Sequence, residues 1–165
     1  MIENAERHFP QPGHDHAACQ SDGLLRAERR CRENGARLTP QRREVLALLL
    51  AEHAALGAYE ILDQIEWQGR KPAPVVVYRA LEFLMEQSLV HKIASRNAFV
   101  ACGHVGDDHG AQFLICDECG QVAEITSDRL GKAIAAVADD AGFRVAAPVI
   151  EVNGICPHCA GADYV

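Results

Sequence analysis

Four of the seven cysteines form two Cys-x-x-Cys pairs in the last third of the chain, Cys116 with Cys119 and Cys156 with Cys159. Two intervening residues let both sulfurs of a pair face one point, and a nearby glycine relieves the tight backbone. Two such pairs complete the tetrahedral thiolate shell of a zinc ion. The spacing therefore predicts one structural zinc site with four cysteine ligands, which cannot be catalytic because four thiolates leave no open coordination position.

Other uses of Cys-x-x-Cys are less compatible with this sequence. A single pair could form the redox disulfide of a thiol-disulfide oxidoreductase, but two pairs in one short region favour zinc. A zinc deaminase needs His-x-Glu beside Pro-Cys-x-x-Cys, and no histidine here is followed two residues later by glutamate. A zinc-ribbon interaction module would not need the basic helical first half described below.

A second group of metal-binding residue types lies between these pairs and the middle of the chain: His91, Cys102, His104, His109 and Glu124. One thiolate, two imidazoles and one carboxylate suit tetrahedral Zn²⁺ better than six-coordinate Fe²⁺ or Mn²⁺. The residues therefore indicate a second zinc site, although spacing does not choose between His104 and His109.

The net charge of −7 is unevenly distributed. Residues 1–101 carry 13 basic and 13 acidic side chains, so residues 102–165 supply the whole excess of acid. Residues 26–43 hold seven arginines against two glutamates. A protein that meets DNA with one face needs local positive charge, so the overall acidity does not exclude DNA binding. Charge alone fits a solvated helix face better.

The first part of the chain is predicted to be mainly helical. Residues 1–20, with their prolines and no apolar periodicity, are expected to form a flexible tail. Thr39 is placed to cap a helix whose first position is Pro40. Helices are expected over 21–35, from residue 40 through at least residue 50, and over 58–67 and 75–86. Strands are expected to follow over 89–93 and 98–102. Helices followed by a hairpin predict a winged helix-turn-helix domain, whose last helix enters the DNA major groove.

The second part is predicted to be a small α/β domain. Strands are expected over 113–115, 121–125, 143–147 and 149–152, with a helix capped by Ser127 and ending near residue 141. The fold class is thus α+β: a tail over 1–20, a winged-helix domain over 21–101, a hinge over 102–110 and a metal-binding domain over 111–165. No signal peptide or membrane segment is visible, so a cytoplasmic location is expected.

Several longer motifs resemble the ferric uptake regulator family, and within it most closely the zinc-responsive members. The resemblance runs from about Leu25 to Cys159. The motifs are Arg37-Leu38-Thr39-Pro40-Gln41-Arg42, Ala58-Tyr59-Glu60-Ile61-Leu62-Asp63, Val77-Tyr78-Arg79-Ala80-Leu81-Glu82-Phe83-Leu84, Leu89-Val90-His91-Lys92 and Phe99-Val100-Ala101-Cys102, followed by both cysteine pairs.

This resemblance implies a homodimeric repressor that binds operator DNA and shuts off zinc-import genes when zinc is plentiful, with no enzymatic activity and no membrane partner. The C-terminal domain would form the dimer. Two zinc ions per subunit are implied, a structural ion on the four paired cysteines and a regulatory ion on His91, Cys102, His109 and Glu124. Tyr59 and Arg79 match base-contacting positions, and Arg37 and Arg42 would hold phosphates.

Two departures from the family pattern are visible. Val76 stands where the family usually has Ser or Thr, which would remove a side-chain cap from the recognition helix. The linker contains Cys102-Gly103-His104-Val105 instead of the His-rich run of iron-sensing relatives, which favours zinc over iron. An iron-, manganese- or peroxide-sensing repressor of the same family remains the alternative.

Overall fold

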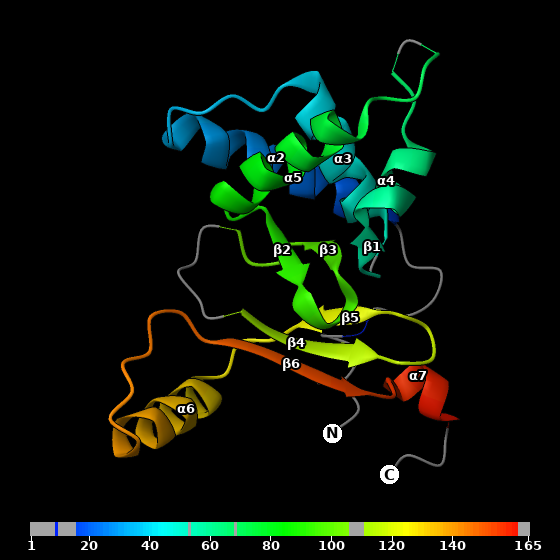
Figure 1. Cartoon of the computed structure of the whole chain (residues 1–165). Coiled ribbons are helices and arrows are strands. Elements are labelled where there is room, and N and C mark those ends of the chain that lie inside the picture. The colour runs from blue at the N-terminus through cyan, green and yellow to red at the C-terminus, as the bar shows by residue number, and fades with distance from the viewer. Residues whose placement is uncertain (1–8, 10–15, 53, 68, 106–110, 162–165) are drawn as a thin grey trace. The chain divides into compact units, whose positions relative to one another are not determined.

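A computed structural model describes residue 9 and residues 16–52, 54–67, 69–105 and 111–161. The chain divides into two compact units. One contains residues 10–106, and the other contains residues 107–165 together with residues 1–9. Figure 1 shows a helical unit with a small sheet, and a second unit built around its own sheet. The elements are α+β in both, as the sequence predicted.

Within the described residues, four helices build the first unit: α2 (His16–Glu33), α3 (Pro40–Ala51), α4 (Ala58–Gln64) and α5 (Pro74–Glu86). On α5 the fully buried side chains Val77, Leu81 and Leu84 recur at helical spacing and belong to one core with Val45 and Leu49 of α3. This amphipathic pattern, rather than the local β-branched run, makes residues 75–86 helical, as predicted.

The helix starts follow local chemistry. The Thr39 hydroxyl accepts a hydrogen bond from the Arg42 N–H at 3.5 Å, with Pro40 at the first helical position. Helix α5 begins at Pro74, and its N-cap Ala73 has no side-chain cap. We expected Val76 to stand at the N-cap position of this helix in place of a capping Ser or Thr. This was wrong, because Val76 already lies inside the first turn. The proline accounts for this early start, since it needs no N–H partner.

A three-stranded antiparallel sheet completes this unit, in the order β1-β3-β2. Strand β2 (Val90–Ile93) pairs with β3 (Ala98–Ala101) through a short turn, and Asn97 takes the left-handed conformation that closes it. Strand β1 (Leu56–Gly57) pairs with the other edge of β3. The helices and this hairpin confirm the winged helix-turn-helix, although a strand of two residues was too short to predict.

Helix α2 begins earlier than predicted. Residues 16–20 were assigned to the tail, but they form its first turns. The Gln20 amide donates to the Ala47 carbonyl oxygen at 2.7 Å, and Gly23 lies close against Leu50, so contacts with α3 hold this part of the helix. These contacts join residues that are far apart in the sequence, so no local pattern predicts them. The remainder of the predicted tail, apart from Phe9, lies outside the described residues.

The second unit contains a sheet of order β5-β4-β6. Strand β4 (Ala111–Cys116) is antiparallel to β5 (Val122–Glu124) and parallel to β6 (Val149–Gly154). Helix α6 (Asp128–Asp140) starts at Ser127, whose hydroxyl accepts the Leu130 N–H at 3.3 Å, as predicted. A short helix, α7 (Pro157–Ala160), carries the last cysteine.

The strand predicted over residues 143–147 is absent. The Phe143 N–H instead donates to the Ala138 carbonyl oxygen at 2.8 Å, and Gly142 takes a positive φ of 68°. These bonds cap the end of α6. The cap therefore uses the Phe143 N–H, which a β-strand would need for pairing with a neighbouring strand. The Phe143 side chain is also 68% exposed, so no burial favours a strand here. None of the helices in the described ranges is long and apolar enough to cross a membrane.

Candidate metal sites and nucleic-acid interface

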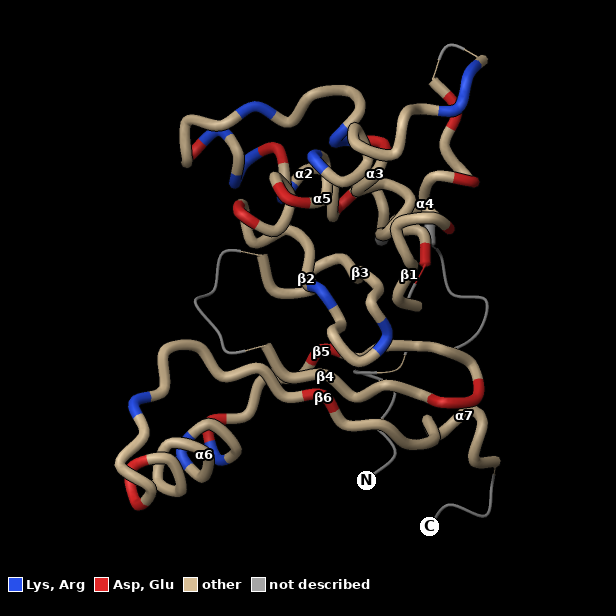
Figure 2. Tube along the Cα trace, in the orientation of Figure 1, with Lys and Arg blue, Asp and Glu red and all other residues tan. Residues whose placement is uncertain are grey.

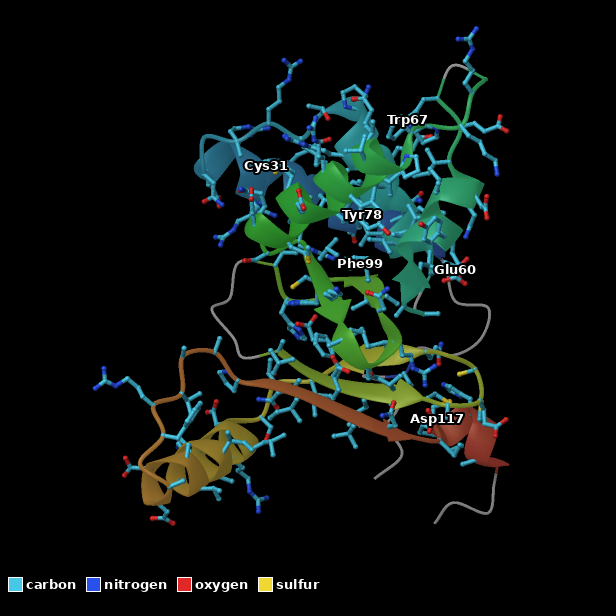
Figure 3. The ribbon with its side chains drawn as sticks, viewed as in Figure 1. Cys31, Glu60, Trp67, Tyr78, Phe99 and Asp117 are labelled. Atoms are coloured by element: carbon cyan, nitrogen blue, oxygen red, sulfur yellow. The ribbon has the colours of Figure 1, made fainter. Side chains whose placement is uncertain are left out.

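Strand register brings the two cysteine pairs together. Cys116 is the last residue of β4 and lies opposite Gly154 of the parallel strand β6. Cys156 follows only two residues later, so both pairs emerge from the same end of the sheet. The Asp117 N–H, in the turn labelled in Figure 3, donates to the Gly154 carbonyl oxygen at 2.8 Å and joins the two segments beyond the strands.

Each pair also has a tight turn of its own. In the first, the Gly120 N–H donates to the Cys116 carbonyl oxygen at 3.0 Å, and the positive φ of Gly120, 73°, lets the chain return toward β5. In the second, Cys156 is the N-cap of α7, and its carbonyl oxygen accepts the Cys159 N–H at 3.1 Å. These turns direct both sulfurs of each pair to one side.

The resulting donor set fits zinc. All four sulfurs lie within 4.8 Å of one another. A tetrahedral ion with Zn–S bonds of about 2.3 Å requires sulfurs about 3.8 Å apart. The Cys119 and Cys156 sulfurs are 3.8 Å apart. Cys116 and Cys156 are buried and Cys119 and Cys159 are exposed, so the site lies at the rim of this unit.

The electrostatics of the sulfurs show why a cation suits them. Burial opposes ionisation of Cys116, but hydrogen bonds from three backbone N–H groups and the Cys119 side chain lower its pKa to about 6. The neighbouring Cys156 and Cys119 thiols raise the pKa of Cys159 to about 12. Without a cation the cluster therefore keeps protons on some sulfurs, and a bound divalent ion would replace those protons.

Phe9 covers this cluster, which the sequence did not indicate. Its side chain is only 7% exposed and packs with Cys116, Ala123 and Cys156. The His158 Nε2 lies 3.0 Å from the Phe9 carbonyl oxygen and donates to it in the tautomer that carries a proton there. A lone phenylalanine in a Pro-rich segment gives no periodic signal, so only the fold shows its role.

The wing strands hold two donors of the predicted second site. His91 of β2 pairs with Val100 of β3, and Cys102 lies two residues beyond Val100, so both side chains share one face. The His91 ring and the Cys102 sulfur offer ligand atoms within 4.8 Å of each other. The Cys102 N–H donates to the Leu89 carbonyl oxygen at 2.9 Å, which holds the buried thiol in place.

The other candidate ligands of the second site are Glu124, His104 and His109. Glu124 is the last residue of β5 in the other unit, where it pairs with Phe113 and is half-buried. His104 lies just after Cys102 and is also half-buried. His109 lies outside the described residues, so the choice between the two histidines remains a prediction.

The exposed half of α5 carries the predicted recognition residue Arg79. Val75, Val76 and Tyr78 are exposed on the same helix, although they are large and apolar or aromatic. Tyr59 of α4 is 70% exposed. Tyr59 and Tyr78 line one hollow of about 400 Å³, together with residues of α4, α5 and the wing that include Glu60 and Phe99. Tyr78, Glu60 and Phe99 are labelled in Figure 3. Tyr78 was not predicted as a contact, although it directly precedes Arg79.

The two other arginines that were predicted to contact DNA, Arg37 and Arg42, differ from each other in burial. Arg37 is exposed just before α3. Arg42 is half-buried, and its Nη1 donates to the Arg37 carbonyl oxygen at 2.8 Å. Arg42 and Arg79 line a second hollow of about 200 Å³, together with Thr39, Gln41, Val76 and Ala80. The N-terminal ends of α3 and α5 thus meet at a surface that carries the positive side chains of Arg42 and Arg79, as a phosphate contact would require.

Taken together, these features define a winged-helix protein with a separate metal-binding unit. The ferric uptake regulator family model matches residues 33–153. The chain belongs to this family, which places it among regulatory proteins rather than enzymes.

Individual relatives support the same placement. The chain is 40% identical to the zinc uptake regulation protein of Escherichia coli over 142 residues, covering 85% of this chain and 82% of that protein. It is 28% identical to the peroxide operon regulator of Bacillus subtilis, covering 78% of this chain and 88% of that protein.

Two solved structures are also similar. A zinc uptake regulator complexed with zinc and DNA matches with a TM-score of 0.80 at 36% identity, covering 88% of this chain and 98% of that one. Holo XcZur matches with a TM-score of 0.76 at 42% identity, covering 87% of this chain and 99% of that one.

Proposed function

We propose that this protein is a zinc-responsive transcriptional repressor that binds operator DNA as a homodimer and shuts off zinc-uptake genes. The observation that carries the proposal is the second donor pair, His91 and Cys102, on one face of the wing in addition to a closed four-thiol site. A closed site is suited to structure, so a separate site with soft and borderline donors is needed for sensing. The similarity to a zinc uptake regulation protein agrees with this role.

Each subunit would bind two zinc ions. One would be held by the four paired cysteines and would stabilise the C-terminal unit. The other would be held by His91, Cys102, His109 and Glu124. Because these four donors come from both units of the chain, an ion bound by all of them would favour one arrangement of the units.

In a dimer, that selected arrangement would set the spacing of two recognition helices to match two half-sites on DNA. Arg79 would read a guanine edge by a bidentate contact, with Tyr59 beside it. Arg37 would hold a backbone phosphate and make binding salt-dependent. Arg42 would contribute its remaining N–H groups to the same surface while it supports α5.

The C-terminal unit offers a surface for the second copy. Helix α6 has no buried residue, although it carries large apolar side chains. Ile134 is 39% exposed and Val137 is 70% exposed. Phe143, Val149 and Val152 add further exposed apolar side chains in this unit. Unpartnered apolar side chains of this number indicate an interface, and a symmetric dimer would bury them.

The proposal is tested by operator binding at controlled free concentrations of Zn²⁺, Fe²⁺ and Mn²⁺, with zinc per subunit measured in parallel. We expect Zn²⁺ to promote operator binding at a lower free concentration than Fe²⁺ or Mn²⁺. We also expect two zinc ions per subunit in the DNA-bound form. Binding promoted by Fe²⁺ or Mn²⁺ but not by Zn²⁺ would instead establish an iron- or manganese-sensing repressor. Binding lost only on peroxide treatment of an iron-loaded form would indicate a peroxide sensor.

A further inference from the structure

Helix α2 carries an arginine cluster that the proposed DNA contacts do not use. Arg26, Arg29 and Arg30 line a hollow of about 210 Å³ together with Glu33 and Val105. None of these residues lines the hollow that contains Arg79. Figure 2 shows Lys and Arg positions recurring along α2.

Two buried donors in this cluster have no acceptor. The Nε atoms of Arg26 and Arg30 are inaccessible to solvent and lack a hydrogen-bond partner among the described residues. In the described part of the chain, Arg26, Arg29 and Arg30 also form no ion pair, whereas Glu28 on the same helix is paired with Arg43. A buried donor on a charged group is costly when it is left unsatisfied.

The spacing of the arginines adds to this cost. Arg26 lies three and four residues before Arg29 and Arg30, so the three positive charges share one helical face and repel each other. Three arginines and one glutamate leave the hollow with a formal charge of +2. An anion in the hollow would be bound by the guanidinium groups that line it and would reduce the repulsion.

We propose that this hollow binds a phosphoryl group. Guanidinium groups donate paired hydrogen bonds in a fixed plane, which matches the oxygens of phosphate. Val105 supplies an apolar wall beside these guanidinium groups. The phosphoryl group comes either from the backbone of DNA or from free phosphate or a phosphorylated small molecule, and the experiment distinguishes these sources.

The first arm measures the thermal unfolding midpoint of the full-length, zinc-containing protein in increasing inorganic phosphate, with ionic strength held constant by NaCl. A ligand that binds only the folded state raises the midpoint in a saturable way. We expect this rise in the wild-type protein and its loss in the double variant Arg26→Gln/Arg30→Gln. Arg32→Gln, an exposed arginine of the same helix outside the hollow, is the matched control and should keep the rise.

The second arm measures the salt dependence of binding to a random-sequence duplex, so it needs neither an operator nor a zinc response. If each subunit holds one backbone phosphate in the hollow, the slope of log K against log salt should fall by about 1.8 per dimer in the double variant. An effect in the first arm alone assigns the site to free phosphate or a phosphorylated small molecule. An effect in the second assigns it to DNA.

The proposal is overturned if the double variant and Arg32→Gln behave alike in both arms. If the glutamine pair does not fold by circular dichroism, Arg26→Lys/Arg30→Lys replaces it. That pair keeps the charge and removes the planar guanidinium donors, so it should still reduce the phosphate effect. A failure of zinc-dependent operator binding would leave both arms interpretable, because neither uses it.

Discussion

The guanidinium carbon of Arg42 on α3 lies 3.5 Å from the centre of the Phe83 ring on α5. The same side chain donates to the Arg37 carbonyl oxygen. One arginine therefore joins the segment before α3 to α3 itself and to the helix that carries Arg79. Its charge stabilises the packing of these helices through a cation–π contact as well as contributing to the surface potential.

Replacement of Arg42 should affect stability as well as DNA binding. Arg42→Ala removes the contact with Phe83, so we expect the free energy of unfolding to fall by about 1–2 kcal/mol. Urea unfolding measures this change. Arg37→Ala, which removes an exposed side chain, is the control and should weaken DNA binding with stability unchanged. If Arg42→Ala weakened DNA binding at full stability, the arginine would be a phosphate contact only.

Replacement of Cys102 should separate sensing from structure. Cys102→Ser removes the thiolate of the proposed regulatory site, so the zinc-dependent gain in operator affinity, expected to be about 10- to 100-fold, should disappear. Metal analysis should still find one zinc per subunit. Cys119→Ser is the complementary variant and should lose the structural ion. Zinc-responsive binding retained in Cys102→Ser would refute the sensing assignment.

Replacement of Arg79 should reduce discrimination between sequences. A bidentate contact with guanine distinguishes the correct base by about 1–3 kcal/mol, so Arg79→Ala should bring operator and random DNA closer in affinity by about that amount. Fluorescence anisotropy with both duplexes measures the ratio. Arg37→Ala should instead weaken both equally. An unchanged ratio in Arg79→Ala would move the recognition role to another residue of α5.

Removal of the Phe9 side chain should expose the four-thiol cluster. Phe9→Ala uncovers Cys116 and Cys156, so we expect zinc to pass to a chelator faster and the C-terminal unit to lose about 2 kcal/mol of stability. A colorimetric chelator measures the rate. Leu25→Ala is the control, because that apolar side chain is 62% exposed and lies in the other unit. Equal release rates in the two variants would show that Phe9 does not protect the site.

A charge on α6 should disrupt the proposed dimer. Val137 is 70% exposed on a helix without buried residues, so Val137→Glu should be tolerated by the monomer fold. Burying its carboxylate in an interface should weaken dimerisation by at least about 2 kcal/mol. Analytical ultracentrifugation measures this shift. Val75→Glu, an exposed valine on α5, should leave the dimer intact. An unaffected dimer in Val137→Glu would place the interface elsewhere.

Much of the fold could be predicted because its signals are local. Thr39 and Ser127 cap helices through bonds to residues three positions away, and the apolar spacing on α5 identifies its buried face. The missed features lack such signals. The segment at Phe143 has strand-forming residues, but bonds to the end of α6 decide its conformation.

The candidate sites also have features with local signals, which were predicted, and some features that depend on long-range contacts, which were missed. The chemistry of the metal donors could be predicted from the sequence, because thiol, imidazole and carboxylate side chains and the Cys-x-x-Cys turn depend only on residue type and short spacing. The sequence also predicted Arg79 as a base contact by its motif, and this assignment stays a prediction. It could not show that Arg42 rests on Phe83, or that Phe9 covers the thiols.

The convergence of the two cysteine pairs depends on long-range packing. Cys116 and Cys156 are 40 residues apart, and the parallel pairing of β4 with β6 places them at one end of a sheet. That register depends on hydrogen bonds and buried side chains summed over the whole unit. The same holds for His91 and Cys102, whose shared face follows from strand pairing. Residue type supplies the donors, and long-range packing supplies the geometry that lets them act together.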